Sequence, residues 1–294
     1  MPFKKLNVDV ASSRLAVSRR RALGLGGSIG LGALLTACST TEPGASTTAA
    51  TSTGAATLTP STAAAGDIVA KLDAVGSSCG TETEDVTSGP YYFDVDSIRS
   101  DLREDRPGTQ LDIAFRVWDA NCTPLPNSVV EIWHCDAGGV YSGFESASTG
   151  GGGGGRVGGG GGTTDGSYTE GDSEATPGDD GTYLRGAQVA DANGIVQFTT
   201  VWPGWYRGRT VHVHLKVHVN KATVLTAQVG FDDDLNTIVF DTSPYDEHTG
   251  RDTFNGGSAG SGTDNIISSS AQLLTVETTA TGYLGYINLD VGQV

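Results

Sequence analysis

Apolar and polar side chains alternate without interruption through residues 210–219. Successive side chains of a β-strand point to opposite faces, so this pattern predicts a strand with one face in a hydrophobic core. That face would carry Val211, Val213, Leu215 and Val217. The polar face would carry His212 and His214, about 6.6 Å apart along the strand, which is close enough for two imidazoles to reach one metal ion. His218 follows on the same face at about 13 Å from His214, too far to share that ion.

Short apolar or alternating segments separated by turn residues recur along the chain. The clearest is at 110–117, where Leu111, Ile113, Phe115 and Val117 would point inward. Further segments lie at 129–133, 195–201, 223–231, 273–277 and 283–291. No strong amphipathic helix pattern accompanies them. The pattern predicts a mainly β protein, an antiparallel or mixed β-sandwich with few helices in a single domain.

The N-terminal segment has a different pattern. Residues 1–38 begin with basic side chains, including Arg19 and Arg20, and continue with a short apolar run at 23–35 that is rich in Gly and Ala. Such a run favours an export signal over a transmembrane helix. The arginine pair indicates the twin-arginine route. Residues 35–38, with the sequence LTAC, resemble a bacterial lipoprotein cleavage site in which Cys38 is lipidated.

Composition divides the rest of the chain. Residues 39–70 are dominated by Ser, Thr and Ala, with Gly and Pro, a composition too poor in apolar surface to fold, so we predict a tether there. The globular domain is expected at 71–294. The predicted product is therefore exported to the cell surface, with membrane contact only through a possible lipid anchor.

The chain is acidic, with a formal net charge of −16. Removing residues 1–37 takes away six of 18 basic residues and one of 34 acidic residues, which leaves 12 basic against 33 acidic and a net charge of −21. Nucleic acids and anionic lipid headgroups are poor partners for such a surface. Small neutral molecules are compatible with it.

A metal site needs more than one His-x-His pair, because most such histidines are exposed or have ordinary hydrogen-bond partners. From the histidine pair alone, two alternative functions remain open. One is a zinc hydrolase or lyase that uses His212 and His214, but the sequence offers no third His or nearby Glu at ligand spacing. The other is a transthyretin-like surface binding module without catalysis.

Three motifs together resemble a known family. They are GPYY at 89–92, IWHCDAGGVY at 132–141 and TVWPGWYRGRTVHVH at 200–214. In this order they are similar to the intradiol ring-cleavage dioxygenases, the catechol and protocatechuate dioxygenase family. The resemblance covers most of the chain after about residue 79 and independently implies a β-sandwich that forms the catalytic domain.

The resemblance implies a mononuclear non-haem Fe(III) bound by two tyrosines and two histidines. These would be Tyr141, Tyr206, His212 and His214. Arg209 and Gln228 match the active-site arginine and glutamine of the family, and the motif with Tyr91 and Tyr92 lies near the substrate pocket in the family. The resemblance therefore implies that Tyr91, Tyr92 and Arg209 bind the substrate. Ferric iron, a hard cation, accepts phenolate oxygen as well as imidazole nitrogen, so the residue types agree with this assignment.

The implied reaction is cleavage of a catechol-type diol by O₂ between its two hydroxyl-bearing carbons, giving a muconate-type diacid. A bound diol would displace one tyrosine, which we expect to be Tyr206. Arg209 would stabilise developing negative charge, with Gln228 in support. Only five residues separate Tyr206 from His212, and a helical N-terminal dimerisation region is missing. The chain departs from better-known members in both respects, which leaves substrate preference and oligomeric state open.

Three cysteines follow Cys38. An exported protein meets an oxidising environment, so one disulfide and one free thiol are the simplest expectation for Cys79, Cys122 and Cys135. The extended segment between Cys122 and Cys135 would hold those two apart. We therefore expect Cys79 to pair with one of them.

A Gly-rich insertion at about 145–181 separates Tyr141 from Tyr206. It lacks the Gly-Lys-Ser/Thr ending of a phosphate-binding loop. We expect a surface excursion that leaves and returns near the pocket and acts as a flap or a spacer.

Overall fold

The computed structural model describes residues 62–75, 79–148, 157–158, 174–255 and 262–294, all within one compact unit, Leu58–Val294. The predicted export signal, Cys38 and most of the predicted tether lie outside these residues and stay predictions. Among the helices of the described residues, none is long and apolar enough to cross a membrane.

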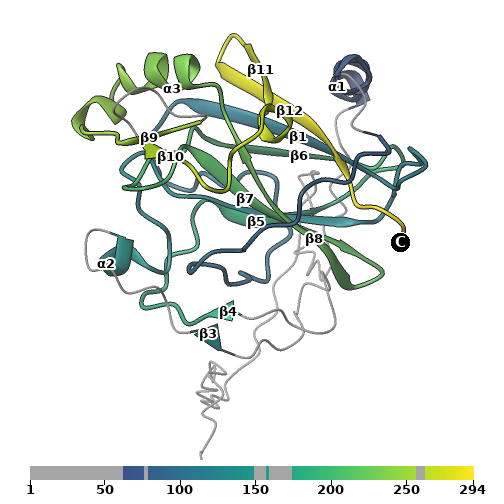
Figure 1. The fold of residues 1–294 in the computed structure, drawn as a ribbon, viewed down its shortest axis with the longest axis horizontal. Helices are drawn as coiled ribbons and strands as arrows, with labels where there is room; N and C mark the ends of the chain where they lie inside the picture. The colour runs from purple at the N-terminus through teal and green to yellow at the C-terminus, as the bar shows by residue number, and fades with distance from the viewer. Residues whose placement is uncertain (1–61, 76–78, 149–156, 159–173, 256–261) are drawn as a thin grey trace, which may run out of the picture. The chain divides into compact units, whose positions relative to one another are not determined.

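Two four-stranded sheets form the body of the unit (Figure 1). The first has the order β11 (Thr275–Thr278), β12 (Gly282–Asp290), β1 (Gln110–Trp118) and β6 (Ile195–Val201). The second has the order β5 (Arg185–Val189), β2 (Val129–Trp133), β7 (His212–Val219) and β8 (Ala222–Gly230). β1 and β12 are parallel and the other pairs in these sheets are antiparallel. The predicted mixed β-sandwich with few helices is confirmed.

The hydrophobic core lies where alternating side chains of the two sheets meet. From the first sheet it receives Ile113, Phe115 and Phe198, and from β7 it receives Val213 and Leu215, each at most 1% exposed. The apolar face predicted for residues 210–219 is therefore in the core. A β-sheet can bury one face in this way while its other face carries polar groups, which makes the outer face of β7 available for a site.

The remaining helices and strands of the described residues lie outside the two four-stranded sheets. The helices are α1 (Thr62–Ala74), α2 (Glu145–Ser148), α3 (Asp233–Phe240), η1 (Tyr245–Glu247) and η2 (Ser270–Gln272). The short strands are β3 (Val157–Gly158), β4 (Glu174–Ala175), β9 (Thr253–Phe254) and β10 (Gly262–Thr263). Asp232 caps α3 by accepting hydrogen bonds from the amides of Asp234 and Leu235.

α1 begins at Thr62, inside the stretch at 39–70 for which composition predicts a tether. Its Ile68 and Leu72 are buried and pack with Ala114 of β1 and Tyr286 of β12. Residues four apart share one helix face, so these two apolar side chains stabilise the helix against the sheet. The composition of the surrounding residues conceals this local pattern.

One disulfide joins Cys79 to Cys122, and Cys135 is free and buried. The expected arrangement, with Cys79 as a partner and no bond between Cys122 and Cys135, is confirmed. The disulfide fixes the start of the segment at 79–93. That segment is also hydrogen bonded to the outer edge of β8, because the Val86 amide donates to the Thr226 carbonyl at 2.7 Å and the Thr226 amide donates to Asp85 at 2.9 Å.

Candidate metal centre

The four predicted metal ligands converge on one point. Nε2 of His212 lies 3.1 Å from Nε2 of His214, 3.1 Å from the Tyr206 hydroxyl and 3.4 Å from the Tyr141 hydroxyl. Nε2 of His214 lies 3.1 Å from the Tyr141 hydroxyl. Four atoms that far apart can each lie about 2 Å from a shared centre, which is a typical metal–nitrogen bond length.

β7 positions the two histidines on its outer face, as the alternation predicts. His212 donates from Nδ1 to the Thr210 carbonyl at 2.6 Å, so its Nε2 presents a lone pair to the centre. The His214 ring stacks on Trp133 with centroids 5.0 Å apart and planes at 11°. Its Nδ1 is buried without a hydrogen-bond partner in the described structure.

The two tyrosines come from loops that pack backbone to backbone. Tyr141 follows β2 and Tyr206 follows β6. A Cβ atom on Gly139 would lie 2.3 Å from the Trp205 carbonyl oxygen, and one on Gly204 would lie 2.5 Å from the carbonyl oxygens of Asp136 and Ala137. Glycine at both positions therefore allows the close approach that brings the hydroxyls together.

Tyr206 lies outside the strand that carries the two histidines. β7 begins at His212, and Tyr206 lies in a tight turn closed by the Arg209 amide, which donates to the Tyr206 carbonyl at 3.2 Å. Tyr206 also keeps partial exposure, whereas Tyr141 is fully buried. The two hydroxyls are thus held by different means, one in a packed aromatic cluster and one on a turn.

Burial keeps all four groups neutral in the absence of a cation. It raises the pKa of Tyr141 well above its usual value and that of Tyr206 to about 12, although Arg209 acts in the opposite direction on Tyr206. Burial, helped by Arg209, lowers the pKa of His212 to about 3, and burial with the neighbouring His212 lowers that of His214. Two neutral imidazoles 3.1 Å apart, together with two phenols that a cation can deprotonate, fit a metal ion of the kind the sequence predicts.

In the described residues, no three His, Cys, Asp or Glu side chains gather at metal-ligand distance. The zinc alternative would use His212 and His214 with a third ligand of these types, and the described structure places none beside them. The side chains nearest these two imidazoles at this point are the hydroxyls of Tyr141 and Tyr206.

Arg209 lies at the rim of the centre with one contact at each nitrogen of its guanidinium. Nη1 is 3.4 Å from Nε2 of His212, Nη2 donates to Oε1 of Gln228 at 2.5 Å, and Nε donates to Oδ2 of Asp264 at 2.8 Å. Gln228 in turn donates to the Thr87 carbonyl at 2.8 Å. The structure therefore places Arg209 beside His212, one of the four predicted ligands, and Gln228 beside Arg209.

Tyr91 and Tyr92 differ in position. The Tyr91 ring packs on Tyr141 with centroids 5.0 Å apart, so it lies beside the centre. Tyr92 is fully buried, packs on Trp133 at 4.8 Å and donates its hydroxyl to Glu131 at 3.0 Å. The expected proximity to the pocket is direct for Tyr91, whereas Tyr92 supports the ring that stacks on His214.

Gly89 closes the site from the side of the segment at 79–93. It has φ of 76°, and a Cβ atom built on it would lie 3.2 Å from Cε1 of His214. The backbone therefore rests directly on the imidazole. The disulfide and the hydrogen bonds to β8 hold this segment against the ligand strand.

Sequence patterns did not reveal Arg185, whose side chain is buried next to Tyr141. It donates from Nε to the Ser142 hydroxyl at 2.8 Å and from Nη2 to the Ser142 carbonyl at 3.0 Å. Its guanidinium lies over Phe93 at 4.3 Å and 5.9 Å from the Tyr141 ring centroid. Burial lowers its pKa to about 10, so it keeps its charge at neutral pH. Arg185 therefore anchors the residue after Tyr141 and places a cation near that phenol.

The ends of the Gly-rich insertion meet at the site, as expected. The amides of Gly178 and Asp179 donate to the Gly143 carbonyl at 2.7 and 3.3 Å, and the Ala175 amide donates to the Tyr92 carbonyl at 2.7 Å. The two bonds to Gly143 close a stem at the base of the insertion, and the bond to Tyr92 ties its returning part to the segment at 79–93. The flap or spacer role concerns residues 149–173, most of which lie outside the described part of the chain.

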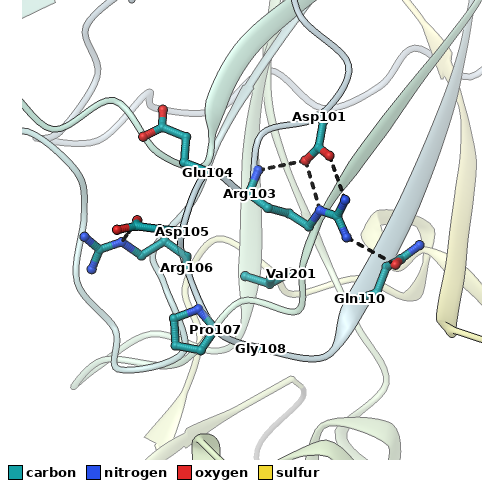
Figure 2. A pocket seen from close by; sticks show the side chains of 9 residues that line it. All are labelled: Asp101, Arg103, Glu104, Asp105, Arg106, Pro107, Gly108, Gln110 and Val201. Atoms are coloured by element: carbon teal, nitrogen blue, oxygen red, sulfur yellow. Dashed lines mark hydrogen bonds and ion pairs between the residues drawn. The ribbon is translucent and has the colours of Figure 1, made fainter.

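A separate pocket of about 520 Å³ lies away from these ligands (Figure 2). Arg103 crosses it and pairs with Asp101 at 2.7 Å, while its Nη1 donates to Gln110 at 3.3 Å. None of the predicted site residues lines it. Its charged lining groups all form ion pairs, some with one another and others with residues outside the pocket, so it does not compete with the four-ligand centre as the candidate site.

Comparison with known proteins shows that part of the chain is similar to dioxygenases. A family model described as "Dioxygenase" matches residues 87–153, which contain Tyr91, Tyr92 and Tyr141. Catechol 1,2-dioxygenase from Acinetobacter baylyi is 35% identical over 82 residues, which amount to 26% of this chain and 26% of that protein. The match thus spans about a quarter of the curated relative.

Solved structures extend the similarity over most of the described chain. An intradiol ring-cleavage dioxygenase from Tetranychus urticae is 28% identical with a TM-score of 0.58, covering 71% of this chain and 94% of that one. A second dioxygenase structure has the same identity, a TM-score of 0.59 and coverage of 71% and 93%. The chain has the fold of these dioxygenases, as the sequence motifs predict.

Proposed function

We propose that this protein is an intradiol ring-cleavage dioxygenase that uses one Fe(III) ion to open a catechol-type diol with O₂. The observation that carries the proposal is the convergence of two tyrosine hydroxyls and two histidine nitrogens beside Arg209. The family match, the relative and the structural neighbours support the same enzyme class.

The proposed ligands are Tyr141, Tyr206, His212 and His214. Iron bound there would supply the redox chemistry that lets an aromatic diol react with O₂. The two tyrosines would bind as phenolates and so offset two of its three charges. The protein's part is to position the substrate, move protons and stabilise charge around the reacting ring.

Of the four proposed ligands, Tyr206 is the one that a bound diol would displace most easily. Its position on a turn and its partial exposure contrast with Tyr141, which is enclosed by Tyr91, Trp133 and Phe144. On release, the Tyr206 phenolate oxygen would accept a proton from a diol hydroxyl. Tyr141 would stay bound and hold the geometry.

Arg209 and Gln228 would face the reacting ring. The guanidinium is a fixed donor whose charge can stabilise negative charge that develops as the ring is attacked. Gln228 fixes Nη2 of Arg209 by accepting its hydrogen bond at 2.5 Å. The aromatic side chain of Tyr91 beside Tyr141 offers an apolar surface for the substrate ring.

Oxygen uptake and colour test the proposal on one purified sample. Phenolate bound to ferric iron absorbs visible light, so we expect a red-brown protein with about one iron per chain that consumes O₂ with catechol, hydroxyquinol or protocatechuate. Tyr141→Phe and Tyr206→Phe should each weaken or shift the band, and His212→Ala should lower iron content.

Distinct results would contradict different parts of the proposal. A colourless protein holding one zinc per chain after expression in iron-replete cells would overturn the dioxygenase assignment, as would a coloured protein that consumes no O₂ with any of the three diols. A coloured, active protein indifferent to both tyrosine substitutions would overturn the ligand set alone.

For localisation, we propose export by the twin-arginine route and lipid attachment at Cys38, motivated by the residues at 19–20 and 35–38. Labelling of the full chain in a bacterial host with a fatty-acid analogue should give a labelled, membrane-associated protein. Cys38→Ser should abolish the label. Retention of the label in that variant would contradict lipidation at Cys38.

A further inference from the structure

Asp264 is a buried carboxylate that no sequence motif singles out. It follows β10 and lies 55 residues after Arg209. Its side chain is fully buried, yet it forms an ion pair with Arg209. Burial of a carboxylate is costly unless hydrogen bonds and an opposite charge compensate it, so the surroundings of Asp264 indicate what it holds in place.

Four N–H groups from two segments donate to this carboxylate. Oδ2 accepts from Nε of Arg209 and from the Thr210 amide, both at 2.8 Å. Oδ1 accepts from the amides of Ile266 and Ile267 at 2.7 and 2.8 Å. One oxygen is thus fixed by its own turn, while the other reaches across to the loop that precedes β7.

That second oxygen determines how the Arg209 guanidinium is oriented. With Nε held by Asp264, the planar group can direct Nη2 to Gln228 and Nη1 toward His212, and each of its three nitrogens has one neighbour. Gln228 alone contacts one nitrogen and would leave the plane free to rotate.

We infer that Asp264 is a positioning residue for the proposed dioxygenase reaction, which acts by fixing the guanidinium of Arg209 toward the metal centre. The inference rests on the proposed function, because it assigns Arg209 the task of stabilising charge on the reacting ring. Asp264 touches none of the four proposed ligands. Its loss should therefore affect turnover far more than iron binding.

The test compares Asp264→Asn with wild type in iron content, visible spectrum, melting temperature, kcat and KM. Asparagine keeps the size and one acceptor oxygen but turns an N–H₂ group toward Nε of Arg209 or toward the turn amides. We expect iron content and the visible band to stay close to wild type. We expect kcat to fall roughly 10- to 100-fold, as for loss of a hydrogen bond to a charged group.

A double-mutant cycle with Arg209→Met separates this role from general support of the fold. If Asp264 acts through Arg209, the double variant should turn over no more slowly than Arg209→Met alone. Asp264→Glu is the second variant, with the charge retained and the carboxylate displaced by one methylene. We expect it to hold iron and to have a reduced kcat.

Asp252→Asn is the matched control. Asp252 also bonds the same loop, accepting from the Gly208 amide at 3.0 Å, but its side chain is 43% exposed and pairs with Arg207, not with Arg209. We expect kcat within about twofold of wild type. Asp264→Asn with normal kcat, or effects of Asp264→Asn and Arg209→Met that multiply in the double variant, would overturn the inference. A wild-type protein without O₂ uptake would instead overturn the proposed function.

Discussion

The buried His134 imidazole shows how single residues set the response of the protein to acid. It is fully buried, donates from Nδ1 to the Cys135 carbonyl at 2.7 Å and accepts at Nε2 from the Thr200 hydroxyl at 2.8 Å. Burial lowers its pKa from 6.5 to about 4. The folded protein therefore contains the neutral imidazole, while the unfolded chain takes up a proton below pH 6.5.

This difference predicts a pH-dependent loss of stability. Because the folded pKa is depressed for a base, the unfolded state binds more protons between pH 6.5 and 4, and the His134 contribution to stability falls as pH drops through that window. The slope is at most about 1.4 kcal/mol per pH unit. His134→Gln cannot take up this proton, so its free energy of unfolding should fall less steeply in urea titrations between pH 7 and 4.5. Parallel curves for both proteins would contradict the prediction.

For single residues, the sequence predicts a role when that role depends on the spacing of neighbouring positions. His212 and His214 are two apart on a strand, and the structure places their Nε2 atoms 3.1 Å apart. Asp264 and Arg185 are different, because their partners lie 55 and 43 positions away in sequence. Their importance comes from burial and from contacts made only after folding, which no short pattern encodes.

Among the elements, the segment at 79–93 acts on the site although it contributes none of the four proposed ligands. Its Gly89 rests against the His214 ring with φ of 76°. The turn at 139–141 and the turn at 202–206 make a similar backbone contact. Elements therefore fix the centre mainly by how closely their backbones approach.

Gly89→Ala should reveal this contact. Alanine at positive φ costs about 1 kcal/mol, and the new methyl group would also press on Cε1 of His214. Gly80→Ala is the matched control, since Gly80 lies on the same segment with φ of 77° and open space around its Cβ position. Both variants should lose similar stability in chemical denaturation. Only Gly89→Ala should retain less iron or shift the visible band, and equal behaviour of the two variants at the metal would contradict this.

Strand positions were predictable because alternation is a property of neighbouring residues, and the predicted strands match β1, β2, β6, β7, β8, β11 and β12 to within a few residues. The order of the strands within the sheets was not predictable, since the pairing of β1 with β12 joins residues more than 160 positions apart. The strand expected at 210–219 begins only at His212, and residues 206–211 precede it. They form a turn, because Asp264 and Asp252 accept the amides of Thr210 and Gly208.

For the molecule as a whole, the disulfide between Cys79 and Cys122 ties the first part of the domain to the sandwich. It spans 43 residues of chain and so restricts the unfolded state. A loop of this length corresponds to roughly 4 kcal/mol in the chain-entropy model. The same bond anchors the segment that carries Gly89.

Removal of both sulfurs tests this contribution. We expect Cys79→Ala/Cys122→Ala to lower the free energy of unfolding by roughly 2–4 kcal/mol. Cys135→Ala, which removes the buried free thiol, should cost about 1 kcal/mol. Guanidinium titrations of the three proteins give the comparison. A smaller loss for the double variant than for Cys135→Ala would contradict a stabilising role of the disulfide.

The stem that joins Gly143 to Gly178 and Asp179 has a practical consequence for engineering. Because two backbone hydrogen bonds tie Gly143 to Gly178 and Asp179, we expect the position of Tyr141 to depend on the stem and not on the length of what lies between Ser148 and Glu174. This stretch is therefore the natural attachment point for an affinity tag, a fluorescent reporter or a whole second domain. Grafted there, such a cargo would join the chain beyond the residues that hold Tyr141.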